Sequence, residues 1–166
     1  MTRPAHLLRA WWLAHALMLL LAGCASPPRT PTAPGVQSWS GRLAMNVEGQ
    51  ANQSFSAGFE LKGAPEAGEL TLSNPLGGTA AVLAWSPGTA TLRSNGTTRQ
   101  FASLDELAQE ATGAPLPVAS LFDWLAGRAT PVPGWSVDVS GLPQGRLHAQ
   151  RTAPPPLVDL RVALEH

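Results

Sequence analysis

Hydrophobic and polar residues alternate with a period of two along the chain from Trp39 onward. In the first such segment, 39–47, Leu43, Met45 and Val47 share one face of an extended strand. The same alternation returns at 55–61, 69–73, 135–139 and 158–164. A more continuously apolar strand is expected at 80–85, and further strands are expected at 89–93, 97–101 and 145–150. Turn residues separate these segments at intervals of about 8–12 residues, which predicts an antiparallel meander that curls into a sandwich or barrel. Consecutive hairpins, including one at Asn95-Gly96, favour an up-and-down barrel.

Two short helices interrupt the strands in the middle of the chain. Ser103 is a suitable N-cap for a helix over 104–111, and Glu106, three residues later, completes a capping box. Pro117 opens a second helix over 118–126, which Gly127 ends. Apolar residues cover most of the circumference of this second helix, so it must be buried on most sides.

The N-terminal residues have the pattern of a bacterial lipoprotein signal. Arg3 and Arg9 precede an apolar stretch over 10–22. This stretch is too short to span a membrane, which needs about 20 apolar residues. The stretch ends in Leu-Ala-Gly-Cys at 21–24, which resembles a lipobox, where the cysteine receives a diacylglycerol and the signal is cut before it. Cys24 is the single cysteine, so it is the predicted lipidation site. An ordinary signal peptide and an uncleaved N-terminal helix are the alternatives.

These features predict three parts of the chain. We expect residues 1–23 to be the signal peptide, residues 24–35 to be the lipidated cysteine and a proline-rich tether, and residues 36–166 to be one domain. Ala25, in place of an aspartate that resembles an inner-membrane retention signal, favours the outer membrane as the destination. Loss of Arg3 and Arg9 would change the balance of 11 basic and 11 acidic residues to a net charge of −2. That balance argues against nucleic-acid binding, which needs a basic patch.

Residues that suggest catalysis are scarce. With Cys24 lipidated, His148 and His166 are the histidines that remain after the signal, and no site of Cys and His ligands can form. The sequence has no Gly-x-Ser-x-Gly elbow and no phosphate loop. We expect His148 to lie at the surface or rim of a strand. The sequence therefore favours a binding protein without a cofactor or metal over an enzyme.

Leu76 is an unusual residue within Asn-Pro-Leu-Gly-Gly at 74–78. Pro75 suits position i+1 of a turn, which places Leu76 near the tip of the loop. An aliphatic side chain at a turn tip is unfavourable in water unless something covers it. Leu76 therefore either folds back onto a neighbouring strand, belongs to a tighter loop, or projects and dips into a lipid bilayer.

Four motifs together resemble the LolB family of outer-membrane lipoprotein receptors. They occur in order between about Cys24 and Val139: the lipobox, Trp-x-Gly-Arg-Leu-Ala at 39–44, Asn-Pro-Leu-Gly at 74–77, and Gly-x-x-Leu-Pro-Val-x-x-Leu-x-x-Trp-Leu-x-Gly at 113–127. Each motif is only moderately specific, but the ordered set behind a lipobox is more so. The resemblance implies an open, incomplete antiparallel β-barrel with a short helical lid.

The resemblance also implies a function. The apolar cavity of such a barrel would accept the acyl chains of a lipoprotein from the periplasmic carrier LolA and release them into the inner leaflet of the outer membrane. Pro75, Leu76 and Gly77 would form a loop that inserts into the membrane. The cavity and lid would be formed by Met45, Phe55, Phe59, Leu72, Trp85, Leu121, Trp124 and Leu125.

The chain departs from the family after Val139, where only about 27 residues remain. One or two strands are expected to be missing or shortened, which would leave a more open barrel or a smaller cavity. We expect a lipid-anchored monomer that faces the periplasm, with LolA, acylated lipoproteins and outer-membrane lipid as its partners. The alternatives are a structural or assembly lipoprotein with the same fold and no transfer activity, and a periplasmic hydrolase.

Overall fold

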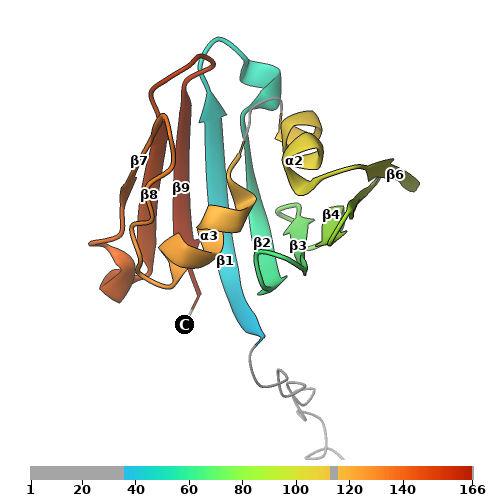
Figure 1. Cartoon of the computed structure of the whole chain (residues 1–166), viewed down its shortest axis with the longest axis horizontal. Coiled ribbons are helices and arrows are strands. Elements are labelled where there is room, and N and C mark those ends of the chain that lie inside the picture. Colours follow the sequence, from blue (N-terminus) through green and yellow to red (C-terminus); the bar gives the residue numbers. More distant parts are fainter. Residues whose placement is uncertain (1–35, 113–115, 166) are drawn as a thin grey trace, which may run out of the picture. The chain divides into compact units, whose positions relative to one another are not determined.

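The alternating segments form nine antiparallel strands of one sheet, in the order β6-β5-β4-β3-β2-β1-β9-β8-β7. The sheet curls but does not close, because β6 and β7 remain as its two edges (Figure 1). This is the mainly β, open antiparallel barrel that the sequence predicts. The strands are β1 (Gln37–Val47), β2 (Phe55–Gly63), β3 (Gly68–Ser73), β4 (Thr79–Ser86), β5 (Thr89–Ser94), β6 (Thr97–Phe101), β7 (Trp135–Asp138), β8 (Arg146–Arg151) and β9 (Val158–Leu164).

The computed structural model describes residues 36–112 and 116–165. The predicted signal peptide, Cys24 and the predicted tether lie outside the described residues, as do Gly113 and His166. The three-part division of the chain therefore stays a prediction. Neither α-helix in the described part of the chain is long and apolar enough to cross a membrane.

Strand β1 lies in the middle of the sheet and pairs with β2 on one side and β9 on the other. Its glycine, Gly41, belongs to the Trp-x-Gly-Arg-Leu-Ala motif and lies opposite both Phe59 and Leu164. A Cβ atom at Gly41 would lie 2.1 Å from the carbonyl oxygen of Ala163. A side chain cannot be accommodated at that distance, so the packing of β1 against β9 requires glycine at this position of the motif.

Two helices lie on the same face of the sheet, α2 (Leu104–Thr112) and α3 (Val118–Leu125) (Figure 1). The backbone N–H of Glu106 donates to Ser103 Oγ at 3.1 Å, which is the predicted N-cap contact. The Glu106 carboxylate accepts from the N–H of Ala102 at 3.0 Å, one residue before the usual partner in a capping box. Helix α3 ends at Leu125, one residue earlier than predicted.

The hydrophobic core fills the space between the sheet and the helices. Inward side chains of every second strand residue meet the apolar faces of α2 and α3, as the alternation predicts. The predicted hairpin turn is also present, since Asn95 and Gly96 have φ of 51° and 75°, as a type I′ turn requires. Two short 3₁₀ turns, η1 (Ala51–Gln53) and η2 (Leu142–Gln144), were not predicted, because three residues carry no periodic pattern.

Candidate functional site

An apolar cavity of about 200 Å³ lies between the concave face of the sheet and the two helices. Of the described residues that line it, only Ser94, Arg99 and Glu110 are polar. The apolar lining comprises Leu43, Met45, Phe55, Phe59, Leu61, Leu70, Leu72, Ala81, Leu83, Leu92, Ala108, Ala111, Leu116, Val118, Leu121, Leu125, Leu160 and Val162. A hydrophobic ligand would find hydrocarbon on nearly every side.

Helix α3 presents different faces to the cavity and to the barrel wall. Val118, Leu121 and Leu125, at spacings of three and four residues, line the cavity from above. Phe122 points to the wall, where its ring makes edge contacts with Trp39 at 5.7 Å and Trp85 at 6.1 Å between ring centroids. The apolar circumference seen in the sequence is thus shared between lining the cavity and anchoring the helix.

Six of the eight residues predicted for the cavity and lid lie in the cavity lining: Met45, Phe55, Phe59, Leu72, Leu121 and Leu125. The structure places the other two, Trp85 and Trp124, in the core outside that lining. Trp85 packs against Phe122, and its indole N–H donates to the carbonyl of Pro65 at 3.1 Å. Trp124 packs against Trp135, with 5.9 Å between the ring centroids. Both tryptophans hold the wall and the lid in place around the cavity.

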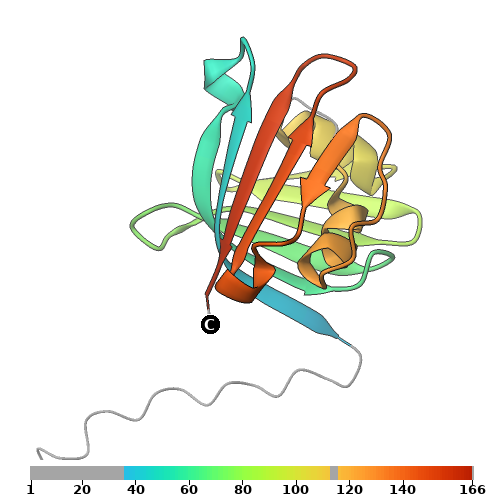
Figure 2. The ribbon, with the colours of Figure 1, turned by 90° about the vertical axis from the view of Figure 1, so that its left-hand side faces the viewer.

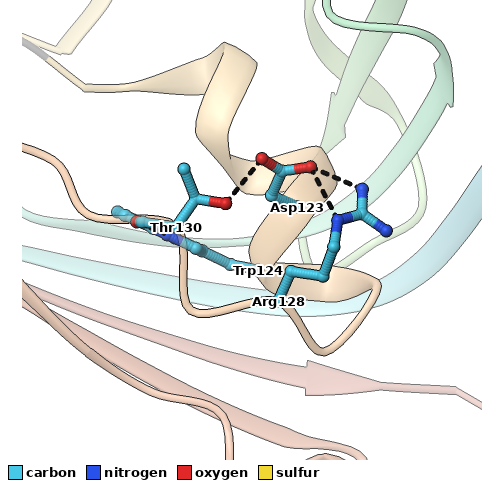
Figure 3. A network of polar contacts seen from close by, with 4 residues as sticks. All are labelled: Asp123, Trp124, Arg128 and Thr130. Atoms are coloured by element: carbon cyan, nitrogen blue, oxygen red, sulfur yellow. Dashed lines mark hydrogen bonds and ion pairs between the residues drawn. The ribbon is translucent and has the colours of Figure 1, made fainter.

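A polar network fixes the C-terminal end of α3 (Figure 3). The Asp123 carboxylate accepts hydrogen bonds from Thr130 Oγ1 at 2.6 Å and from the Arg128 Nε–H at 3.1 Å. The Trp124 indole N–H donates to the carbonyl of Thr130 at 2.9 Å. The hydrogen bond from Thr130, followed by that from Arg128, holds the pKa of Asp123 below its usual value. The loop after α3 is therefore tied to the helix by four side chains.

Helix α2 is tied to the edge of the sheet by a separate ion pair. Arg99 Nη1 on β6 lies 2.6 Å from Glu110 Oε1 on α2, and both side chains are about half exposed. The same guanidinium lies 5.7 Å from the ring centroid of Phe101. Arg99 and Glu110 are also part of the cavity lining, so this pair stands at the polar rim of an otherwise apolar space.

Leu76 projects from the loop between β3 and β4 and is 97% exposed. The loop is held by its own hydrogen bonds: Asn74 Oδ1 accepts from the N–H groups of Leu76 and Gly78, each at 3.0 Å. The Gly77 N–H closes the turn onto the Asn74 carbonyl at 2.9 Å, and Gly77 has a φ of 84°, which favours glycine. The structure therefore shows Leu76 presented outward, and it excludes the fold-back onto a neighbouring strand.

His148 lies on β8 with its side chain 40% exposed, on the face away from the cavity. Its Nε2 is 2.7 Å from Asp159 Oδ2, and Asp159 Oδ1 is 2.8 Å from the Arg161 Nε. Burial raises the pKa of Asp159, but hydrogen bonds from His148 and Gln150 and the nearby positive charges lower it further than burial raises it. No group of three or more His, Cys, Asp or Glu side chains suited to a metal ion occurs among the described residues.

An open barrel that encloses an apolar cavity under two helices is the architecture of a protein that binds a hydrophobic ligand. Sequence comparison identifies the family: the model described as "Outer membrane lipoprotein LolB" matches residues 37–153. The chain belongs to the LolB family. Members of this family are outer-membrane lipoproteins and not enzymes, which confirms the prediction of a protein without catalytic activity.

Several relatives carry the name "Outer-membrane lipoprotein LolB". The protein of Bordetella petrii is 43% identical over 70% of this chain and 61% of its own length. The protein of Chromobacterium violaceum is 32% identical over 76% of this chain and 72% of its own length. The protein of Bordetella parapertussis is 38% identical over 75% of this chain and 65% of its own length. The chain thus spans less than two thirds of the length of two of these three relatives.

Sequence reasoning did not identify all the residues that form the site. Leu61, Leu70 and Leu83 line the cavity and follow the same inward alternation as the predicted residues, so their signal was present but not specific. Phe122 was recognisable only as part of the apolar circumference of the second helix, and the Arg99–Glu110 pair gave no signal, because their contacts join segments that are brought together only by the fold.

Proposed function

We propose that this protein is a lipid-anchored receptor at the outer membrane, facing the periplasm. It accepts acylated lipoproteins from the periplasmic carrier LolA and passes them to the inner leaflet. The observation that carries the proposal is the cavity, which lies directly under α2 and α3. Three of the described residues that line it are polar, and the rest are apolar. Acyl chains are transferred downhill if the cavity binds them better than the carrier does and the bilayer binds them better still.

The lid must move for the cavity to take an acyl chain. A volume of about 200 Å³ is below the roughly 300–1,000 Å³ of pockets that enclose drug-sized ligands. Among its described residues, helix α2 buries only Leu107 and Ala108 in the core and adds one half-exposed ion pair to β6. Helix α3 buries five side chains, including Phe122 and Trp124, so α2 is the helix that moves more readily. The ligand enters beneath α2 while α3 keeps its place.

Filling the cavity tests this proposal. Ala81 lines the cavity on β4, so Ala81→Phe places a ring in the space that the acyl chain would occupy. Ala84, three residues on along the same strand, lies on the opposite face, so Ala84→Phe is the matched control. Carrier loaded with a fluorescent acylated lipoprotein is mixed with each full-length chain, and the amount of cargo transferred is measured.

We expect Ala81→Phe to reduce cargo transfer at least tenfold and Ala84→Phe to leave it near the parental level. Circular dichroism and thermal unfolding show whether both variants keep the fold. Equal transfer by folded Ala81→Phe and the parent would contradict a role for the cavity. A parent that takes no cargo at all would instead favour a structural lipoprotein without transfer activity.

A further inference from the structure

The polar residues of the cavity lining lie together at one edge of the sheet. Arg99 on β6 lies directly opposite Leu92 on β5, and Ser94 is two residues along from Leu92, so all three side chains share the inward face. Arg99 also reaches α2, where its Nη1 lies 2.6 Å from Glu110 Oε1. Figure 2 shows both helices on the concave side of the curled sheet, as Figure 1 does. Ser94, Arg99 and Glu110 thus form a rim cluster on the cavity where α2 faces β6.

Arg99 is the member of the rim cluster that has hydrogen-bond donors left for a ligand. A guanidinium carries several N–H donors, and the hydrogen bond to Glu110 is the only one that the Arg99 side chain makes with the described residues. The Ser94 hydroxyl already donates to the carbonyl of Ala80 at 3.2 Å, and a carboxylate has no donor. Because the side chains of Arg99 and Glu110 are 52% and 53% exposed, their ion pair is weak and opens at little cost.

The rest of the lining determines where the polar atoms of an acylated ligand would lie. Each acyl chain of a diacylglycerol begins at an ester carbonyl, whose oxygen accepts hydrogen bonds. Burial of such an oxygen without a donor is unfavourable, and the apolar side chains of the lining offer none. Chains that enter beneath α2 would therefore place their carbonyls beside Arg99, with the hydrocarbon deeper among residues such as Leu61, Leu83 and Leu121.

We propose that Arg99 binds the ester carbonyl oxygens of the acyl chains and so makes the cavity selective for acylated lipoproteins over plain hydrocarbon chains. This inference rests on the proposed function and assigns a specificity-determining residue to it. Glu110 holds the guanidinium while the cavity is empty, and the ester oxygens replace the carboxylate when α2 moves away from β6. A hydrogen bond from a charged donor then replaces the water that these oxygens lose on entry.

Two lipopeptides that differ in their carbonyl groups test this assignment. One carries a dipalmitoylglyceryl group on its cysteine through ester bonds, and the other is the dihexadecyl analogue, with ether bonds in place of the esters. Each carries a fluorophore on the peptide, and its affinity for the full-length chain is measured by fluorescence anisotropy. The quantity compared among variants is the ratio of the ester-lipopeptide affinity to the ether-lipopeptide affinity, because the difference in solubility between the two ligands is the same for every variant.

The variants separate the guanidinium of Arg99 from the ion pair and from the net charge. Arg99→Leu removes the donor. Glu110→Gln breaks the same ion pair but keeps the guanidinium. Arg93→Leu is the control for charge, since Arg93 is an exposed arginine on β5 that follows the inward Leu92 and so lies on the outward face. Retained affinity for the ether lipopeptide shows that a variant keeps its cavity.

We expect Arg99→Leu to lower the ratio of the two affinities about tenfold from the parental value, which is the magnitude of one hydrogen bond from a charged donor. Glu110→Gln and Arg93→Leu should keep the ratio at or above the parental value. An unchanged ratio in Arg99→Leu would overturn the inference and leave the proposed function standing. So would an equal fall in Glu110→Gln, which would assign the effect to the closing of α2. A parent that binds neither lipopeptide would contradict the proposed function and the inference with it.

Discussion

Replacement of Leu76 tests the proposed membrane step in isolation from binding. Leu76 is 97% exposed, and the hydrogen bonds that shape its loop come from Asn74 and the backbone. Leu76→Ala should therefore change the free energy of unfolding by no more than about 0.5 kcal/mol. None of residues 74–78 lines the cavity, so uptake of cargo should also be unchanged.

The magnitude of the membrane effect follows from the surface that Leu76 offers. Full burial of a leucine side chain is worth about 1.5–3 kcal/mol, and truncation to alanine removes about 2 kcal/mol of that, or roughly 30-fold in partitioning. Leu76→Glu should reduce partitioning further, because an ionised carboxylate must also leave water. We therefore expect delivery of bound cargo into liposomes to slow by about 30-fold or more.

The assay separates uptake from delivery. Each full-length variant is first loaded from the carrier, and the rate at which labelled cargo enters liposomes is then followed. Leu157→Ala is the control, since Leu157 is a partly exposed leucine between β8 and β9, away from the loop. Delivery by Leu76→Glu as fast as by the parent would refute the role of the loop. An equal loss in Leu157→Ala would show that the effect is not specific to Leu76.

Two further predictions concern how α3 is held. Trp124 is fully buried, so Trp124→Ala should lower the free energy of unfolding by about 3–5 kcal/mol, measured by urea denaturation; a loss below 1 kcal/mol would contradict its role as an anchor. The pKa of Asp123 is lower in the folded state than in the unfolded state. The carboxylate therefore stabilises the fold at pH values above its unfolded-state pKa, and this stabilisation is lost as the pH falls through its folded-state pKa. The thermal unfolding temperature of Asp123→Asn should therefore fall less between pH 5 and pH 2 than that of the parent. If the unfolding temperatures of the two proteins fell in parallel with pH, the network would be excluded as a source of stability.

Much of the fold could be predicted because each strand carries its own signal. The segment from Trp39 to Val47 alternates along its whole length, and Asn95-Gly96 specifies its turn locally. The motif glycine Gly41 was recognisable as part of a pattern, but its close approach to Ala163 became clear only in the structure. Local sequence patterns therefore predict the strands and turns, whereas contacts between strands explain why particular residues, such as Gly41, stand where they do.

The cavity lining was less predictable, since alternation distinguishes two faces and says nothing about position along a face. Leu83 and Trp85 both point inward from β4, yet Leu83 lines the cavity and Trp85 packs beneath Phe122. What separates them is the placement of α3 over one end of the strand, which depends on tertiary contacts. The same limit applies to Leu121 and Trp124, neighbours on one helix that face different surroundings.

The central claim is that acyl chains occupy the cavity beneath α2 and α3. The most direct measurement places a photoactivatable group on the acyl chain of a lipoprotein, presents it on the carrier to the full-length chain, and maps the cross-links by mass spectrometry. We predict cross-links to lining residues such as Phe59, Leu83 and Leu121, with none to the outer face of the same strands. Transfer of cargo accompanied by cross-links only outside the cavity, or retention of all cargo by the carrier, would contradict the account.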